Sequence, residues 1–135
     1  HGRKIEILQK NVKKKSIDYI QLLSPTTSKK RMKKIINDSH EMIYYISMLS
    51  TTGGKLKVSS TEILNNYRKI KKINKKKNCV IGFGITDKTI SKLRSADGLV
   101  VGSAICKEIT KSLQKRQNPV TNVSKMVLKL KNKIS

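Results

Sequence analysis

The sequence predicts an α/β fold built on a parallel sheet, and two observations support this prediction. Four short apolar segments alternate with longer segments whose apolar residues recur at helical spacing, which is the pattern of successive strand–helix units. The short segments are rich in β-branched residues and apolar on both faces, as expected for the covered strands of a parallel sheet. No linker or change of composition divides the chain, so residues 1–135 are predicted to form one structural unit.

The order of the predicted elements leaves two architectures open. Four consecutive strand–helix units are compatible with a doubly wound sheet or with part of a closed barrel, and their spacing does not distinguish the two. The predicted strands are 19–23, 42–47, 79–81 and 99–101, and the predicted helices cover 5–12, 28–37, 59–70, 86–93, 105–113 and 123–134.

Two of the predicted helices begin with recognisable capping residues. Ser59 precedes Glu62 by three positions, which is the spacing of a capping box. Thr86 or Asp87 is expected to cap the short helix 86–93.

The net charge of +23 comes mainly from lysine. Lysine outnumbers arginine 26 to 5 and is spread over every predicted helix, whereas arginine is the usual residue for bidentate contacts with nucleic acid. We therefore expect a solvated surface and no nucleic-acid partner. The abundance of Lys, Ile and Asn indicates an A/T-biased genome, which suggests a plastid stroma or a bacterial cytoplasm.

Length and hydropathy restrict the architecture further. A complete (β/α)₈ barrel needs roughly 250 residues, so 135 residues supply about half of one. Because the sequence starts at His1 inside a predicted helix, we expect it to be a partial sequence. It contains neither an apolar run of transmembrane length nor a signal-peptide pattern, so no membrane association is expected.

The two cysteines show no spacing typical of metal ligands or of a redox motif. Such isolated thiols are typical of a reducing compartment. Cys79 opens one apolar run and Cys106 follows another, so both are expected to be small, packed hydrophobic residues.

Glycine-rich turns follow the last two predicted strands and open directly onto helices. These turns are Gly82-Phe83-Gly84 and Gly102-Ser103. Ligands of parallel α/β folds bind beyond the carboxyl ends of the strands. Glycine there lets backbone N–H groups approach an anion, and the helix N-terminus adds partial positive charge. The pair of turns predicts a phosphate site, whereas either turn alone is explained by a tight connection.

The carboxylates are poorly placed for general acid/base catalysis. Glu62 is explained by capping, Asp87 is a capping candidate, and Glu108 lies one turn into a helix. Four others precede strands, at the end opposite any ligand: Asp18, Asp38, Glu41 and Asp97.

The aromatic residues next to the predicted turns are candidates for contact with a ligand. Tyr44 and Tyr45 are adjacent in a strand, so one is expected to face a barrel interior and the other the helices. Phe83 lies between two glycines at a strand end, an unusual position for a core residue, and is a candidate for packing against a bound ring.

Five segments occur together in the order and at the spacings of one family. They resemble strands five to eight, with their loops, of the tryptophan synthase alpha chain, which is a (β/α)₈ TIM barrel, and the resemblance covers roughly residues 4–115. The segments are Ser24-Pro25-Thr26-Thr27, Ile43-Tyr44-Tyr45-Ile46-Ser47, Thr52-Gly53, Gly82-Phe83-Gly84-Ile85 and Gly98-Leu99-Val100-Val101-Gly102-Ser103-Ala104-Ile105.

The resemblance implies a lyase of tryptophan biosynthesis that cleaves indole-3-glycerol phosphate to indole and glyceraldehyde 3-phosphate in a retro-aldol reaction. It implies substrate or phosphate contacts at Tyr44, Thr52, Gly53, Phe83, Gly84, Gly102 and Ser103. The catalytic Glu and Asp of the family belong to strand two and the loop after it, so no catalytic residue is assigned here. Ser50 departs from the family, which usually has Gly at that position.

The resemblance also implies a partner. The family's alpha chain uses no cofactor and pairs with a beta chain that carries pyridoxal phosphate, in a tetramer of two alpha and two beta chains. The alternatives are another phosphate-binding barrel enzyme, a decayed copy without activity, and a basic nucleic-acid-binding module.

Overall fold

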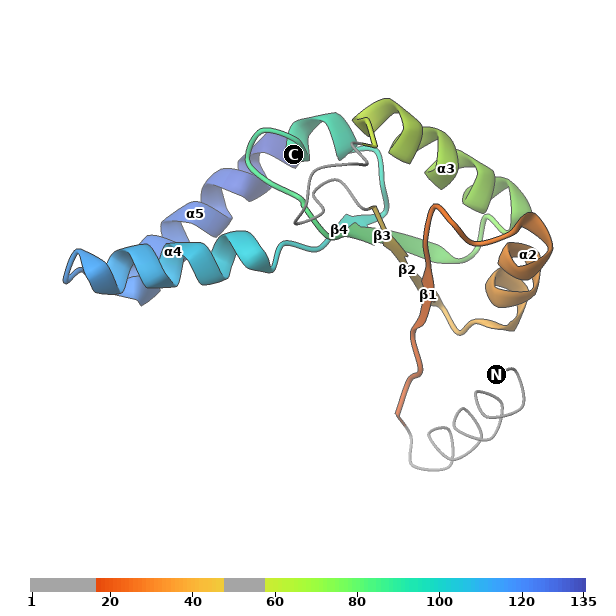
Figure 1. The fold of residues 1–135 in the computed structure, drawn as a ribbon, viewed down its shortest axis with the longest axis horizontal. Helices are drawn as coiled ribbons and strands as arrows, with labels where there is room; N and C mark the ends of the chain where they lie inside the picture. The colour runs from red at the N-terminus through yellow and green to blue at the C-terminus, as the bar shows by residue number, and fades with distance from the viewer. Residues whose placement is uncertain (1–16, 48–57) are drawn as a thin grey trace.

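The fold is a four-stranded parallel sheet with helices on one side (Figure 1). The computed structural model describes residues 17–47 and 58–135. The strands run in the order β1-β2-β3-β4 and pair in parallel. They are β1 (Gln21–Leu23), β2 (Met42–Ile46), β3 (Asn78–Gly82) and β4 (Gly98–Leu99).

The strand order decides between the two architectures that the sequence left open. In a doubly wound sheet the strand order reverses at a switch point where the ligand binds. Here each strand lies next to its successor in the chain, which is the arrangement of consecutive strands in a (β/α)₈ barrel. The described sheet is therefore an open section of a barrel, with β1 and β4 at its edges.

Helices follow the strands as predicted. Three of them begin with a side-chain cap, in which Ser28, Ser59 or Asn118 accepts a hydrogen bond from a backbone N–H of the first turn. The helices are α2 (Lys29–Asp38), α3 (Ser60–Ile73), α4 (Ser103–Gln114) and α5 (Pro119–Ile134), with the 3₁₀ helix η1 (Ile90–Leu93) between β3 and β4.

The core lies between the sheet and the helices. Alternate strand residues point to this side and are fully buried, as the two-residue period of a strand requires. Tyr45 is one of them, and its hydroxyl accepts a hydrogen bond from Asn66 Nδ2 of α3 at 2.9 Å. The buried strand residues are Leu23, Ile43, Tyr45, Cys79 and Ile81, and helices contribute Ile36, Ile63, Tyr67, Ile70 and Leu130.

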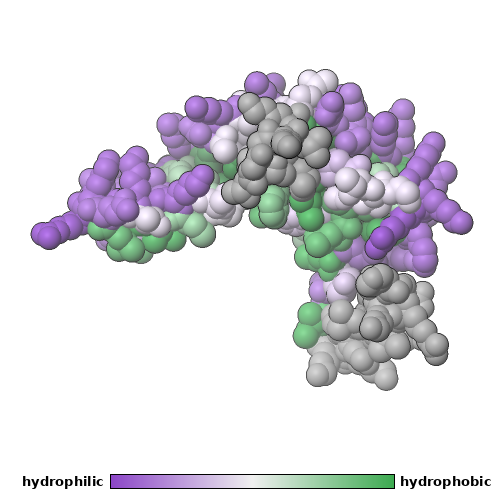
Figure 2. Space-filling view, in the orientation of Figure 1, coloured by the Kyte–Doolittle hydropathy of each residue, from purple (hydrophilic) through white to green (hydrophobic). Residues whose placement is uncertain are grey.

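The opposite face of the sheet has no helix over it among the described residues. Leu22, Tyr44 and Val80 are register partners on this face, and Leu22 is 58% exposed. Apolar residues also gather on the concave side of the molecule beneath α4 and α5 (Figure 2). Tyr44 therefore faces the barrel interior and Tyr45 the helices, as predicted for this adjacent pair.

The structure corrects three details of the sequence prediction. The short helix begins only at Ile90, after the αR residue Thr89, and neither Thr86 nor Asp87 caps it. Thr86 instead forms a turn in which its N–H donates to Thr89 Oγ1 at 3.0 Å. The ladder of β4 ends earlier than predicted, although Val100 N–H still donates to the Ile81 carbonyl at 2.8 Å. Cys106 is exposed, whereas Cys79 is buried as expected.

The helical hairpin of α4 and α5 extends away from the sheet (Figure 1). The apolar stripe of α4 remains open to solvent, with Leu113 61% exposed. Ser112 is buried instead, and its Oγ accepts a hydrogen bond from Asn122 Nδ2 of α5 at 3.0 Å. The two helices thus contact each other through a polar pair, and the apolar stripe faces the concave side.

Candidate functional site at the carboxyl edge of the sheet

Both glycine-rich turns lie at one edge of the sheet. β3 and β4 are hydrogen-bonded neighbours that run in the same direction, so their carboxyl ends meet at that edge. The turn at Gly82-Phe83-Gly84 leaves β3, and Gly102 and Ser103 leave β4 for α4. This is the edge at which parallel α/β folds bind ligands.

The turn after β3 has an unusual backbone. Phe83 has φ 77° and Gly84 has φ 79°, so two consecutive residues adopt the left-handed conformation. That conformation suits glycine but costs a residue with a β-carbon roughly 1–2 kcal/mol. Such outliers concentrate at functional sites. Phe83 is 58% exposed, so its ring is available to contact a ligand.

Tyr44 reaches the same turn from the neighbouring strand. A β-carbon built on Gly82 would lie 1.9 Å from the Tyr44 hydroxyl oxygen, so the tyrosine side chain lies directly against the glycine. Gly82 is the diagonal neighbour of Tyr44, which pairs with Val80. The structure therefore brings Tyr44 to the turn that carries Phe83 and Gly84.

Ser47 forms hydrogen bonds to this turn, and the sequence analysis did not identify it as a site residue. It directly follows β2, is fully buried, and its Oγ donates to the carbonyls of Gly82 at 2.9 Å and Phe83 at 2.5 Å. The signal available in the sequence was a hydroxyl residue that ends an otherwise apolar strand.

The N-terminus of α4 differs from those of the other three described α-helices. Its N-cap is Gly102, and no side chain accepts a hydrogen bond from its first turn, whereas α2, α3 and α5 are each capped by a side chain. The first N–H groups of a helix need an acceptor and attract anions. Ser103, the first residue of α4, is exposed at this point.

Gly102 has no structural need to be glycine within the described part of the chain. Its φ is −116°, which any residue adopts, and a β-carbon built on it meets nothing within 4 Å. Gly84 has a positive φ and Gly82 lies against Tyr44, but neither reason for glycine applies to Gly102. An absent side chain here leaves space for something to approach the backbone.

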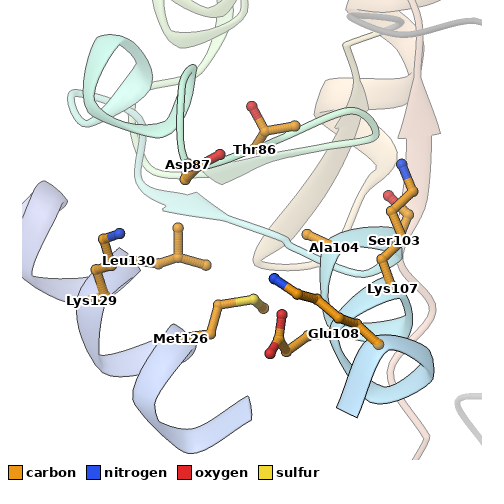
Figure 3. A pocket seen from close by; sticks show the side chains of 10 residues that line it. Thr86, Asp87, Ser103, Ala104, Lys107, Glu108, Met126, Lys129 and Leu130 are labelled. Atoms are coloured by element: carbon orange, nitrogen blue, oxygen red, sulfur yellow. The ribbon is translucent and has the colours of Figure 1, made fainter. Parts of the chain in front are cut away.

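A cavity of about 450 Å³ adjoins Ser103 (Figure 3). Of the residues predicted to contact substrate or phosphate, it includes Ser103 alone. Lysines of α4 and α5 line the cavity, together with the carboxylates of Asp87 and Glu108, to which the sequence analysis gave no catalytic role. Its lining is Thr86 and Asp87 after β3, Ser103, Ala104, Lys107, Glu108 and Lys111 of α4, and Met126, Lys129 and Leu130 of α5.

The acidic residue Asp97 lies at the other end of the sheet, as predicted. Its Oδ2 accepts hydrogen bonds from Lys71 Nζ at 2.9 Å and from Cys79 N–H at 2.8 Å. Burial alone would raise the pKa of Asp97, but these two partners lower it overall. Burial also raises the pKa of the Cys79 thiol to about 12, so this cysteine is a packed hydrophobic residue. Both groups support the fold and lie far from the carboxyl edge.

Two of the predicted site residues, Thr52 and Gly53, lie outside the described residues. Of the others, Phe83 and Gly84 belong to the turn after β3, Tyr44 of β2 lies against Gly82 at that turn, and Gly102 and Ser103 form the start of α4. Within residues 17–47 and 58–135, no three His, Cys, Asp or Glu side chains come together as metal ligands. No helix in the same ranges is long and apolar enough to cross a bilayer.

The chain is similar in sequence to tryptophan synthase alpha chains. A family model described as the tryptophan synthase alpha chain matches residues 3–135. The tryptophan synthase alpha chain of Pelagibacter ubique is 73% identical over 126 residues, which are 93% of this chain and 48% of the relative. That of Methanocaldococcus jannaschii is 38% identical over 103 residues, which are 75% of this chain and 36% of the relative. The chain spans about half the length of the relatives it matches, or less.

Solved structures show the same similarity. A tryptophan synthase alpha subunit from Legionella pneumophila superposes with a TM-score of 0.74 at 27% identity, covering 90% of this chain and 44% of that one. The alpha subunit from Campylobacter jejuni gives 0.68 at 27% identity, covering 93% and 48%. The matched structures are TIM barrels, so the open four-stranded sheet corresponds to part of such a barrel. From its sequence and its fold together, this chain belongs to the tryptophan synthase alpha chain family.

Proposed function

We propose that this chain is the C-terminal half of a single TIM-barrel domain, residues 1–135, in the alpha subunit of a tryptophan synthase. The complete subunit cleaves a carbon–carbon bond of indole-3-glycerol phosphate to give indole and glyceraldehyde 3-phosphate, within a synthase that as a whole is classed as a carbon–oxygen lyase of tryptophan biosynthesis. This half supplies strands five to eight and binds the phosphate of the substrate. Membership of the family and the two turns at the carboxyl edge support this proposal.

The observation that carries the phosphate site is the conformation of Gly102. It begins α4 without a side-chain cap, and neither its φ nor its surroundings require glycine. A phosphate oxygen that accepts hydrogen bonds from the first N–H groups of α4 gives a reason for both features, because a β-carbon would limit its approach. Gly84 and Ser103 complete this phosphate site, and Gly53, outside the described residues, is assigned to it through the family resemblance alone.

The remaining predicted residues surround the rest of the substrate. Tyr44 and the exposed Phe83 supply aromatic surface next to the phosphate turns, which suits an indole ring. Thr52, outside the described residues, matches a threonine of the loop that in the family closes over the site and excludes water. The acid and base that transfer protons are a Glu and an Asp of the other half of the barrel, so this chain alone is inactive.

The complete subunit works with a second protein. Its partner is the tryptophan synthase beta chain, in a tetramer of two alpha and two beta chains, and the pyridoxal phosphate belongs to that partner. The alpha chain itself needs no cofactor. The relatives named above come from a bacterium and an archaeon, which supports a bacterial cytoplasm for this protein and gives no support to a plastid.

The test uses a complete barrel, which we define as a chimera in which this chain replaces the matching segment of the Pelagibacter ubique alpha chain. We expect this chimera to release indole from indole-3-glycerol phosphate and the isolated chain to release none. Catalysis by the isolated chain would contradict the assignment of the proton-transfer groups to the other half.

The phosphate site is tested in the same chimera. Gly102→Asp is expected to weaken substrate binding at least about tenfold, because the carboxylate occupies the space left by glycine and repels the phosphate. Gly84→Asp is expected to do the same. Substrate affinity that is unchanged in both variants would refute the phosphate site while leaving membership of the family intact.

A further inference from the structure

Ser47 has a buried hydroxyl whose hydrogen bonds all go to the turn after β3. Its side chain has no solvent exposure, and a buried hydroxyl without partners is unfavourable. The single Oγ proton is shared between the Gly82 carbonyl at 2.9 Å and the Phe83 carbonyl at 2.5 Å, and the Ser47 N–H also donates to the Gly82 carbonyl at 3.0 Å. The residue directly after β2 thus binds two successive carbonyls that are 35 and 36 positions further along the chain.

Because of the geometry of the peptide bond, these hydrogen bonds also determine the direction of two N–H groups. In a trans peptide the carbonyl of one residue and the N–H of the next point in opposite directions, and the described residues contain no cis peptide. Because Ser47 holds the carbonyls of Gly82 and Phe83, the N–H groups of Phe83 and Gly84 point away from it. No hydrogen bond of either N–H is found in the described structure, so both are available to an external acceptor.

The two carbonyls depend on the hydroxyl to different degrees. The Gly82 carbonyl keeps the Ser47 N–H as a donor even without the side chain, whereas the Phe83 carbonyl has the Ser47 hydroxyl as its only donor among the described residues. The hydroxyl therefore chiefly orients the Phe83–Gly84 peptide. It also stabilises the left-handed conformation of Phe83, which a residue with a β-carbon otherwise avoids.

We propose that Ser47 is a positioning residue that aims the Gly84 N–H at the phosphate of the substrate. It touches no substrate itself and acts through the Phe83–Gly84 peptide. This inference rests on the phosphate site proposed above and assigns to it a residue from a third strand.

The experiment compares Ser47→Ala, Ser47→Thr and Ser47→Cys with the unmodified complete barrel. Inorganic phosphate is titrated while the Gly84 amide is followed by ¹H–¹⁵N NMR, and the free energy of unfolding is measured in urea. Threonine keeps the hydroxyl donor and cysteine keeps the size with a weaker donor, so the test remains decisive if the alanine variant does not fold.

Ser39→Ala is the matched control. The Ser39 Oγ is also buried and donates to a backbone carbonyl, that of Ile36 at 2.7 Å. Ser39 precedes β2 and therefore lies at the opposite end of the sheet from the phosphate site. Its replacement removes the same chemical group and costs comparable stability without touching the turn.

We expect Ser47→Ala to weaken phosphate binding roughly three- to tenfold, the equivalent of one hydrogen bond, and to reduce the response of the Gly84 amide. Ser47→Thr should restore both, Ser47→Cys should fall between them, and Ser39→Ala should bind phosphate normally. Unchanged phosphate affinity in Ser47→Ala, with a stability loss like that of Ser39→Ala, would overturn this inference alone. An unmodified barrel that binds no phosphate would overturn it together with the proposed site.

Discussion

Tyr44 and Gly82 occupy one crowded point on the concave face of the sheet. A β-carbon on Gly82 would lie 1.9 Å from the Tyr44 hydroxyl oxygen and 2.4 Å from its ring carbon Cζ, well inside van der Waals contact. Glycine at this position is therefore a packing requirement of β3 as well as the start of a turn.

We predict that Gly82→Ala destabilises the complete barrel by about 1–3 kcal/mol, as overpacking does in tightly packed sites. The measurement is urea unfolding followed by circular dichroism. Adding Tyr44→Leu should recover part of the loss, because it removes the hydroxyl and the ring carbons that the new methyl group meets. Gly102→Ala is the control and should leave stability nearly unchanged, since its β-carbon meets nothing within 4 Å.

Asp97 links β4 to α3 and β3 through its charge. The hydrogen bonds from Cys79 N–H and Lys71 Nζ lower its pKa against the effect of burial. A carboxyl whose pKa is lower in the folded state than in the unfolded state stabilises the folded protein. This contribution is fully present when the pH is above the pKa of the unfolded state, about 3.9. That contribution is lost as the pH falls through the folded pKa.

We predict that Asp97→Asn lowers the free energy of unfolding by about 1 kcal/mol at neutral pH and makes little difference at about pH 2. Urea titrations of both proteins across this range provide the measurement. Asp38→Asn is the control, because Asp38 forms an exposed pair with Lys34 at 2.9 Å, and such pairs contribute little. A deficit of Asp97→Asn that persists undiminished in acid would contradict the electrostatic explanation.

At the scale of single elements, the helix caps explain where α2, α3 and α5 begin. Ser59 accepts a hydrogen bond from the Glu62 N–H at 3.2 Å, which is one half of the capping box that the sequence predicted. The start of η1 could not be found in the same way. Thr86 and Thr89 bond to each other in a turn before it, so the capping residue that the sequence offered serves the turn.

We predict that Ser59→Ala destabilises the protein by about 1 kcal/mol through the loss of the α3 cap. The melting temperature of the complete barrel provides the measurement. Thr61→Ala, an exposed change in the first turn of the same helix, is the control and should have almost no effect. Equal melting temperatures for Ser59→Ala and the unmodified protein would mean that α3 is held by its packing alone.

At the scale of the whole molecule, apolar side chains are exposed on the concave face, and the two edge strands of the described sheet have no partner on one side. The exposed apolar residues on the sheet, the turn and the helical hairpin include Leu22, Phe83, Val100 and Leu113. β1 and β4 are also the edges of the sheet that the described residues form, without a further strand beside them, and such edges promote association with other strands. A half-barrel therefore needs a second half to bury its inner face.

We predict that the isolated chain unfolds over a broad range of urea concentration and self-associates, and that the complete barrel unfolds sharply as a monomer. Sedimentation velocity and urea unfolding of both proteins provide the measurement. A sharp, cooperative transition of the isolated chain as a monomer would show that its own core, between α2, α3 and the sheet, is sufficient for stability.

The sequence alone determined the elements and the chemistry of the turns. Local patterns extend over a few residues, so alternation of strands and helices, the Ser59 cap and the glycine turns at Gly84 and Gly102 were all predictable. The burial of Cys79 followed from its place in an apolar run, but Cys106 lies on a helix whose apolar stripe faces the open side. Burial there depends on what covers a helix, which the residue pattern does not encode.

Only the tertiary structure decided which residues meet. The sequential order of the strands distinguished a barrel section from a doubly wound sheet, because strand order is a property of long-range pairing. The contact of Tyr44 with Gly82 and the two hydrogen bonds of Ser47 join positions 35 or more residues apart. The sequence predicted an anion site from two glycine turns, and the fold supplied the buried serine that orients one of them.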